Sequence, residues 1–280
     1  MTTHTLSQKE LIDISLSREE LYVVMRLLKA QALPGFDLSW LKRGLDGLVS
    51  DDIRQELEVA TNALIARGYI TDVKPSSETS PLTMSMPSPL IALVGTCAFA
   101  NYNVLLALHT KQGQRQMYLH QLREPGVVHT MPLPDIHQFE AVDGRTGILR
   151  VIDATLGLHK QTSLVLPAGK ALVVDVQAAR DAALAGRVDE AEGLLLRGGL
   201  PTVTAQVLSR AMKAATALGA ISIIKRNEDG EPQATTLALV ITPTMCFTLA
   251  DDAPGTHPAT FLVQPVSAEA LQRWITDTLP

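Results

Sequence analysis

The sequence is poor in charged residues, aromatic residues and cysteine. Of its 280 residues, 19% are charged and 4% are Phe, Trp or Tyr. Two cysteines exclude a scaffold built on disulfides, and so few aromatic side chains argue against a surface that stacks bases or sugars. A net charge of -5 argues against a broadly basic nucleic-acid binder. The chain is 46% hydrophobic, so it can bury a core and is not disordered.

The longest stretch without a charged residue runs from residue 79 to residue 110. A membrane-spanning helix needs about 20 consecutive apolar residues. Here three prolines, Gly95 and the polar residues 101–103 interrupt the stretch. We therefore expect no membrane span, and we predict two buried strands, over residues 90–97 and 103–110, joined by a turn.

The first 15 residues are polar and contain no apolar core of signal-peptide length. We therefore expect a cytoplasmic protein in which Cys97 and Cys246 are reduced. Both lie in apolar runs, and no general base stands near either in the sequence. We therefore interpret both cysteines as buried thiols that pack in the core. An enzyme that uses Cys97 or an assembled histidine site is the third-ranked alternative.

The first half of the chain predicts helices followed by strands. Ser17 and Glu20 have the spacing of a capping box, a shorter second helix is predicted over residues 40–48, and Ser50 caps a third. Residues 75–89 hold four prolines and predict a loop. Short strand-forming runs separated by turns then predict an antiparallel meander. We expect the next helix to begin near Asp135.

The second half shows the same order. It predicts a helix over residues 175–186, a short helix from Asp189, and a long helix that Thr202 or Thr204 caps and that runs through Leu218 to end at Gly219. Strands follow, and Ser267 begins a final helix.

These patterns predict an α+β fold with an internal repeat. Residues 63–70 and 214–221 each lead from a helical pattern through glycine into a strand pattern. We predict two pseudo-symmetric halves, over residues 1–160 and 161–280, each with helices followed by an antiparallel sheet. The halves are expected to interlock in one domain.

The second half resembles a known family. Its features are Val-Asp-Val at 174–176, Leu-Leu-Leu-Arg-Gly-Gly-Leu at 194–200, the helix at 203–218, the Asp-Gly turn at 229–230 and the strand at 261–266. The order resembles the EspG family of type VII (ESX) secretion-associated proteins. The resemblance implies an EspG-like fold of two quasi-repeated halves. It also implies a cytosolic, non-enzymatic chaperone, without a cofactor, that holds helical secretion substrates of the PE–PPE class.

Two apolar segments are candidate partner-binding surfaces. Methionine adapts to varied surfaces, and an apolar patch beside a double glycine can accept a partner helix. The alternative is that these side chains pack in the core. A homodimer also stays open. The candidate partner-binding residues are Met84, Met86, Leu194, Leu195, Leu196 and Leu200.

Other chemistry has weaker support. His109, His120 and His129 fall on adjacent predicted strands, but no His-x-His, HExxH or Cys-x-x-Cys spacing supports a metal site. We therefore expect no metal and no cofactor. Residues 17–73 could form a winged helix, which makes a DNA-binding regulator the runner-up. The third helix of that segment, from residue 51, has four acidic and two basic residues, so it lacks the charge that phosphates require.

Overall fold

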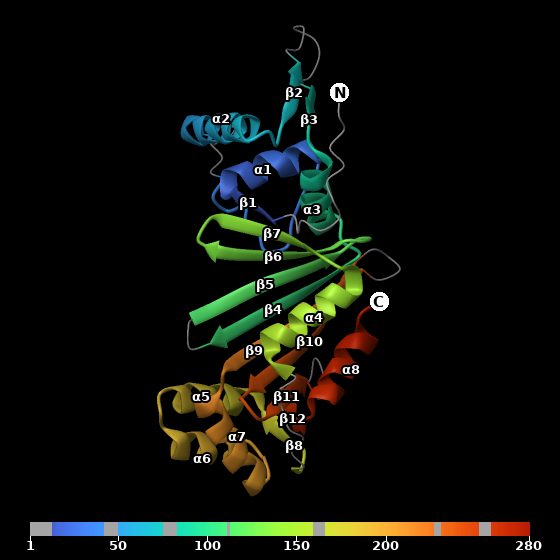
Figure 1. The fold of residues 1–280 in the computed structure, drawn as a ribbon. Helices are drawn as coiled ribbons and strands as arrows, with labels where there is room; N and C mark the ends of the chain where they lie inside the picture. The colour runs from blue at the N-terminus through green and yellow to red at the C-terminus, as the bar shows by residue number, and fades with distance from the viewer. Residues whose placement is uncertain are drawn as a thin grey trace. The chain divides into compact units, whose positions relative to one another are not determined.

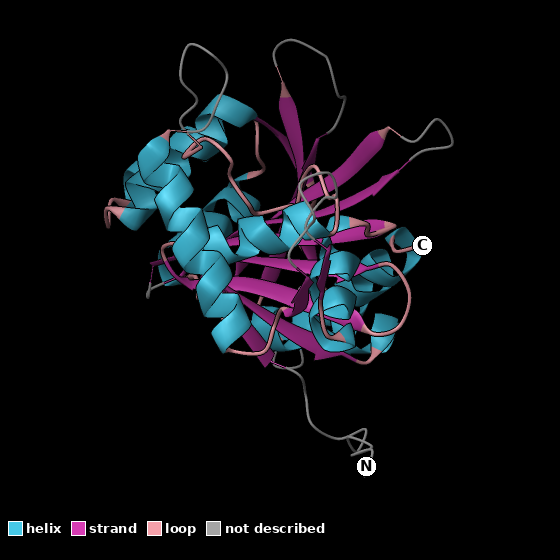
Figure 2. Cartoon of the chain, turned by 90° about the horizontal axis from the view of Figure 1, so that it is seen from above, coloured by secondary structure: helices cyan, strands magenta, loops and turns pink. Residues whose placement is uncertain are grey.

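A computed structural model describes most of the chain as a mixture of helices and strands (Figures 1 and 2). Its described residues form eight α-helices and twelve strands, and the strand pairs for which registers are resolved are antiparallel. The fold class is α+β, as predicted. Among the described residues, no helix combines the length and the apolarity needed to cross a membrane. The described ranges are 13–41, 50–74, 83–110, 113–158, 166–226, 231–251 and 259–280.

One order of elements occurs twice along the chain, which confirms the predicted pseudo-symmetry. A strand and three helices lead into four strands and a closing helix; the first copy also contains the β2–β3 pair. Strand neighbours follow the order β1-β7-β6-β5-β4 in the first copy and β8-β12-β11-β10-β9 in the second. The first copy is β1 (Asp13–Ser17), α1 (Arg18–Leu27), α2 (Asp51–Ala66), β2 (Thr71–Lys74), β3 (Thr83–Ser85), α3 (Ser88–Ala98), β4 (Tyr102–Thr110), β5 (Gly113–Gln121), β6 (Gly126–Leu133), β7 (Ile136–Val142) and α4 (Gly144–Leu156). The second copy is β8 (Gly169–Leu172), α5 (Val173–Leu184), α6 (Val188–Arg197), α7 (Thr202–Ala214), β9 (Ala217–Arg226), β10 (Pro232–Ile241), β11 (Cys246–Asp251), β12 (Thr260–Val266) and α8 (Ala268–Thr278).

The chain divides into two compact units. Unit 1 comprises residues 1–103 and 117–148, and unit 2 comprises residues 104–116 and 149–280. The chain passes from one unit to the other within β4, β5 and α4. The predicted halves, 1–160 and 161–280, stay a prediction.

In unit 1, α1 begins at the predicted capping box. The Ser17 hydroxyl accepts a hydrogen bond from the Glu20 amide at 3.2 Å, and the Glu20 carboxylate accepts one from the Ser17 amide at 2.9 Å. This exchange satisfies two amides that a helix start otherwise leaves without partners. Helix α1 contacts both α2 and α3. The largest side chains of the core are Leu16, Leu21, Met25, Leu64, Ile70, Leu90, Leu93 and Phe139.

The predicted strand over residues 90–97 is wrong, because this segment is helix α3. Pro89 stands in its first turn, where a missing amide proton costs little. Its buried side chains Leu90, Leu93, Val94 and Cys97 recur at helical spacing. The predicted loop over 75–89 also ends earlier, since β3 and the start of α3 occupy its last part. Residues 75–82 lie outside the described residues.

The predicted helix near Asp135 is also wrong. Pro134 and Asp135 form the turn between β6 and β7, and Asp135 has a left-handed φ of 64°. Proline followed by a residue with positive φ is turn chemistry, and aspartate tolerates that conformation better than most residues. The helix starts only at Gly144.

In unit 2, helices α5, α6 and α7 pack against one another. As predicted, α8 is capped by Ser267, whose hydroxyl accepts a hydrogen bond from the Ala270 amide at 3.1 Å. The core beneath the helices draws on both helices and strands. Its most buried residues include Ala171, Ala179, Ala191, Leu195, Ala205, Leu208, Phe247 and Val263.

The third helix of unit 2 differs from its prediction at both ends. Pro201 is its N-cap residue, and the Thr204 hydroxyl instead donates to the Pro167 carbonyl at 2.7 Å. The helix ends at Ala214, and strand β9 already begins at Ala217, within the expected continuation to Leu218. Gly219 therefore does not terminate a helix. It lies where β9 approaches β4, and a Cβ atom there would overlap the Ala107 carbonyl oxygen.

We predict that Gly219→Ala destabilises the protein, because the added methyl group must push backbone aside. Overpacking of this kind typically costs about 1–3 kcal/mol. Urea unfolding followed by circular dichroism measures the effect. Gly193→Ala in helix α6 is the matched control, since a Cβ there meets only the flexible end of Arg197 at 3.7 Å. The control should be stabilising by up to about 1 kcal/mol. Equal stability of the two variants would contradict the proposed close approach.

Candidate functional site

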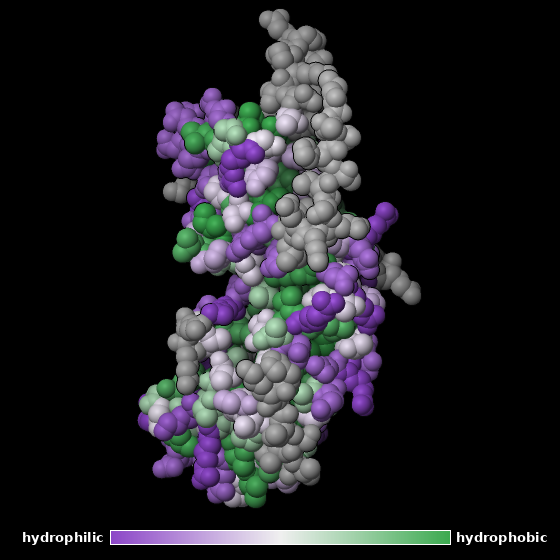
Figure 3. Space-filling model, viewed as in Figure 1, coloured by the Kyte–Doolittle hydropathy of each residue, from purple (hydrophilic) through white to green (hydrophobic). Residues whose placement is uncertain are grey.

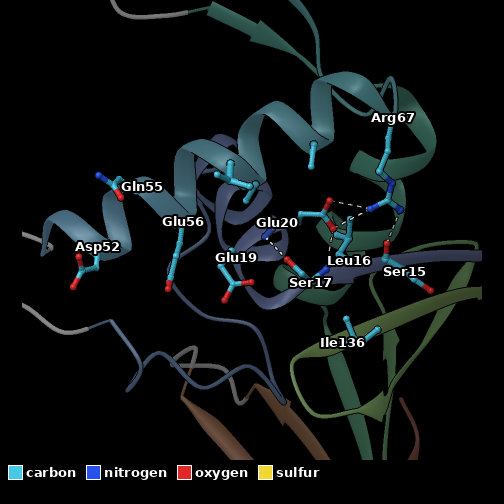
Figure 4. A pocket seen from close by; sticks show the side chains of 13 residues that line it. Ser15, Leu16, Ser17, Glu19, Glu20, Asp52, Gln55, Glu56, Arg67 and Ile136 are labelled. Atoms are coloured by element: carbon cyan, nitrogen blue, oxygen red, sulfur yellow. Dashed lines mark hydrogen bonds and ion pairs between the residues drawn. The ribbon is translucent and has the colours of Figure 1, made fainter.

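A groove of about 900 Å³ opens along helix α2 of unit 1 (Figure 4). We call it the α2 groove. Strand β1, the first turn of α1 and the start of β7 supply its other side chains. Its lining residues are Ser15, Leu16, Ser17, Glu19, Glu20, Asp52, Gln55, Glu56, Val59, Ala60, Ala63, Arg67 and Ile136.

Helix α2 presents one face to the groove. The lining positions of α2 run from Asp52 to Arg67 and repeat every three to four residues, with the adjacent pairs 55–56 and 59–60 among them, which is the pattern of one helix face. At 1.5 Å per residue this face is about 22 Å long. The adjoining face, with Ile53, Ala60 and Leu64, is buried. The helix is thus anchored on one side and open on the other.

One carboxylate ties the elements of the groove together. Glu20 is 7% exposed and accepts hydrogen bonds from Arg67 Nη1 at 2.9 Å to each of its two oxygens. Arg67 Nη2 donates to the Ser15 carbonyl at 2.7 Å. Arg67 is the C-cap residue of α2, whereas Glu20 belongs to α1 and Ser15 to β1. The ion pair therefore fixes the end of the groove at the C-terminus of α2.

The charges of Glu19 and Arg67 persist at neutral pH. Burial tends to raise the pKa of Glu19, but hydrogen bonds from its own backbone amide and from Arg18 outweigh it, so the pKa is lowered. Burial tends to lower the pKa of Arg67, but the hydrogen bonds and negative charge of Glu20 outweigh it, so the pKa is raised. Both groups stay ionised.

The middle of the groove is apolar. Val59 leaves 68% of its surface exposed, and it lies beside the small side chains of Ala60 and Ala63. Where Figure 1 draws α2, the space-filling view shows hydrophobic atoms among mainly hydrophilic ones (Figure 3). Small side chains leave room for the backbone of a partner helix, and an exposed valine gives it an apolar contact.

Unit 2 has a separate cavity of about 530 Å³. Helix α5 and strands β9 to β12 supply most of its wall, and His109 lies at it. Several wall residues, including Met212, Leu218 and Val240, also belong to the buried core of unit 2. Much of this cavity is therefore space within a core, and a surface helix would fit it less well than the α2 groove.

The six predicted partner-binding residues line neither the α2 groove nor the unit 2 cavity. Met86 is half-buried against the core of unit 1, and the side chain of Met84 lies outside the description. Leu195 and Leu200 are buried in the core of unit 2, and Leu194 packs against it. Leu196 is 38% exposed. Their role in partner binding stays a prediction.

Three histidines of unit 1 form a buried cluster. His129 Nε2 lies 2.9 Å from His137 Nδ1, and the rings of His120 and His129 are stacked with centroids 5.9 Å apart. His120 Nδ1 lies 2.6 Å from the Asn103 side-chain oxygen, and Tyr118 stacks on two of the rings. Within the described residues, no group of three or more His, Cys, Asp or Glu side chains is arranged to hold a metal ion. The sequence pointed to His120 and His129 but not to His137.

Burial keeps these imidazoles neutral. It lowers the pKa of His120 to about 3, and it is the main cause that lowers the pKa of His137 to about 4. The pKa of His129 is well below its usual value, through burial and then through the neighbouring histidines.

Both cysteines are buried, as predicted. Burial raises the pKa of Cys246 to about 12 and that of Cys97 well above its usual value. Because the thiolate is the nucleophile, neither cysteine is poised for catalysis near neutral pH.

Sequence reasoning assigned α2 correctly but did not identify the groove. One residue in the sequence could have indicated the groove. Val59 is a large apolar residue that stands off the buried face of the helix, among charged neighbours. Such a residue marks a second face that requires cover.

Comparison with known proteins gives a likeness of fold. No protein-family model and no curated protein sequence matches the chain. Among solved structures, the chain is similar to the type VII secretion system chaperone EspG5 of Mycobacterium tuberculosis, solved in complex with the PE25–PPE41 dimer. The TM-score is 0.61 at 13% sequence identity, over 96% of this chain and 97% of that one. The predicted EspG-like fold is confirmed at the level of fold.

The histidine cluster predicts a loss of stability in mild acid. An unfolded imidazole has a pKa of about 6.5, so below that pH the unfolded chain binds protons that the folded chain does not. The free energy of unfolding should hold above about pH 6.5 and fall steadily toward about pH 5, by about 1.4 kcal/mol per pH unit for each histidine. Urea unfolding across this range measures it.

His120→Gln tests the assignment. It should reduce this pH slope by about one proton, or about 1.4 kcal/mol per pH unit. Phe139→Leu is the control for packing, because Phe139 stacks on His129 at 4.6 Å without titrating. The control should lower stability equally at each pH. An unchanged slope in His120→Gln would contradict the account.

Proposed function

We propose that this chain is a non-enzymatic, cytoplasmic binding protein that holds a helical protein client, as a type VII secretion chaperone does. The observation that carries the proposal is the agreement of fold over 96% of the chain with EspG5, whose solved complex contains the PE25–PPE41 dimer. The EspG-like order of motifs in the second half supports it. The client we propose is a helical secretion substrate of the PE–PPE type.

The α2 groove is where we place the client. A helix held in a groove needs a helix face to lie along and an apolar contact on it. The α2 face is about 22 Å long, and its apolar part, a strip of about one helical turn, lies between charged ends. Val59, Ala60 and Ala63 supply the strip. Because the Glu20–Arg67 ion pair holds the C-terminal end of α2, the strip is formed before a client binds. A preformed site reduces the entropy lost on binding.

Binding is favoured over catalysis and over DNA recognition. The two thiols are buried and protonated, which leaves no ready nucleophile of that type. The helix that a winged-helix reader would place on DNA is α2, and its groove face carries Asp52 and Glu56. Those carboxylates would repel phosphates.

We predict that Val59→Arg weakens complex formation. A long charged side chain in the centre of the strip would fill the space that a partner helix needs and would replace an apolar contact with a charged one. The expected loss of affinity is at least about tenfold, which is about 1.4 kcal/mol. The chain is co-expressed with candidate PE–PPE-type helical dimers, and the complex is measured by size-exclusion chromatography and titration calorimetry.

The control is Val174→Arg on α5. Val174 is also 68% exposed and also lies on a helix, but it lines neither the α2 groove nor the unit 2 cavity. This variant should bind as the wild type does. If no helical dimer co-elutes with the wild-type chain, the proposed function is wrong. If both variants bind equally well, the client does not occupy the α2 groove.

A further inference from the structure

The α2 groove is polarised along its length. Asp52 and Glu56 stand at the N-terminal end of the α2 face, one helical turn apart, and Val59, Ala60 and Ala63 follow. Arg67 closes the other end, where its charge is matched by Glu20 at 2.9 Å. A helix that lies along α2 therefore meets two carboxylates first and an apolar strip next.

Among the described residues, the carboxylates of Asp52 and Glu56 are the charges of the groove without an ion-pair partner. The other acidic side chains that line it are in ion pairs, Glu19 with Arg18 at 2.8 Å and Glu20 with Arg67. Within the described part of the chain, neither Asp52 nor Glu56 has an ion-pair partner. Both are exposed. The nearby Arg54 pairs with Asp51 at 3.3 Å and does not line the groove.

We infer that the segment seated in the α2 groove is a basic amphipathic helix. It would present Lys or Arg residues, four positions apart, to Asp52 and Glu56, and an apolar strip to Val59 and Ala63. This inference rests on the proposed function and adds the chemistry of the client. Complementary charge at the margin of an apolar contact speeds association and sets the register of the two helices.

A second copy of this chain is a poorer occupant. The chain carries 29 acidic and 24 basic residues, so two copies repel at long range. An acidic helix would place like charges opposite Asp52 and Glu56, and a neutral apolar helix would leave them unmatched. A basic partner is the occupant that satisfies both the strip and the charges.

Synthetic helical peptides test the inference with the full-length chain. One labelled peptide of about 18 residues, five turns of helix, carries Ala and Leu on one face and Lys at positions four apart beside it; its counterpart has Glu in place of Lys. Fluorescence anisotropy measures the two affinities. The Lys peptide should bind the wild-type chain at least about fivefold more tightly than the Glu peptide, and the difference should shrink as salt screens the charges.

Matched charge reversals on one helix localise the effect. Glu56→Lys should lower the affinity for the Lys peptide by about fivefold and raise the affinity for the Glu peptide. Glu58→Lys changes the net charge equally, but Glu58 does not line the groove, so its affinities should stay within about twofold of the wild type. Both sites are exposed on α2, so both variants should fold.

Three outcomes overturn the inference: the Lys peptide fails to bind, the two peptides bind alike, or Glu56→Lys and Glu58→Lys behave alike. In each of them the proposed function can still stand, because co-elution of a helical dimer and its sensitivity to Val59→Arg are measured separately.

Discussion

The buried carboxylate of Glu20 is the constraint on which unit 1 depends. It caps the Ser17 amide at the start of α1 and also takes both Nη1 contacts of Arg67 at the end of α2. Arg67 continues to the Ser15 carbonyl of β1. A carboxylate buried to this degree needs a charged partner, since an unpaired buried charge is costly. Three elements are therefore joined at one point.

The arrangement of the α2 groove depends on this ion pair. Helix α2 is fixed at its C-terminal end and buried along the Ile53–Leu64 face, and an adjoining face lines the groove. This face carries the exposed Val59, followed by two alanines and preceded by two carboxylates that have no ion-pair partner among the described residues. An apolar strip of this kind is unfavourable in water and gains by being covered. The same network that stabilises the fold thus leaves a surface suited to a partner.

Local chemistry let the sequence predict part of this fold. The Ser17–Glu20 spacing identified a helix start because capping is decided within four residues. Helix α3 was missed because its exposed side also carries apolar residues such as Ile91, so the run resembles a buried strand. The Asp135 turn was missed because one acidic residue suits both a helix cap and a left-handed turn. The α2 groove depends on contacts 47 residues apart, and sequence pattern does not encode their geometry.

The proposed function depends on a helical client that lies along α2. Hydrogen–deuterium exchange of the chain, free and in complex with a co-purified helical dimer, tests it most directly. The account predicts slower exchange over α2 (Asp51–Ala66) and at the end of β1 in the complex, because a seated helix excludes water from their exposed faces. Protection confined to other elements, with exchange in α2 unchanged, would contradict it.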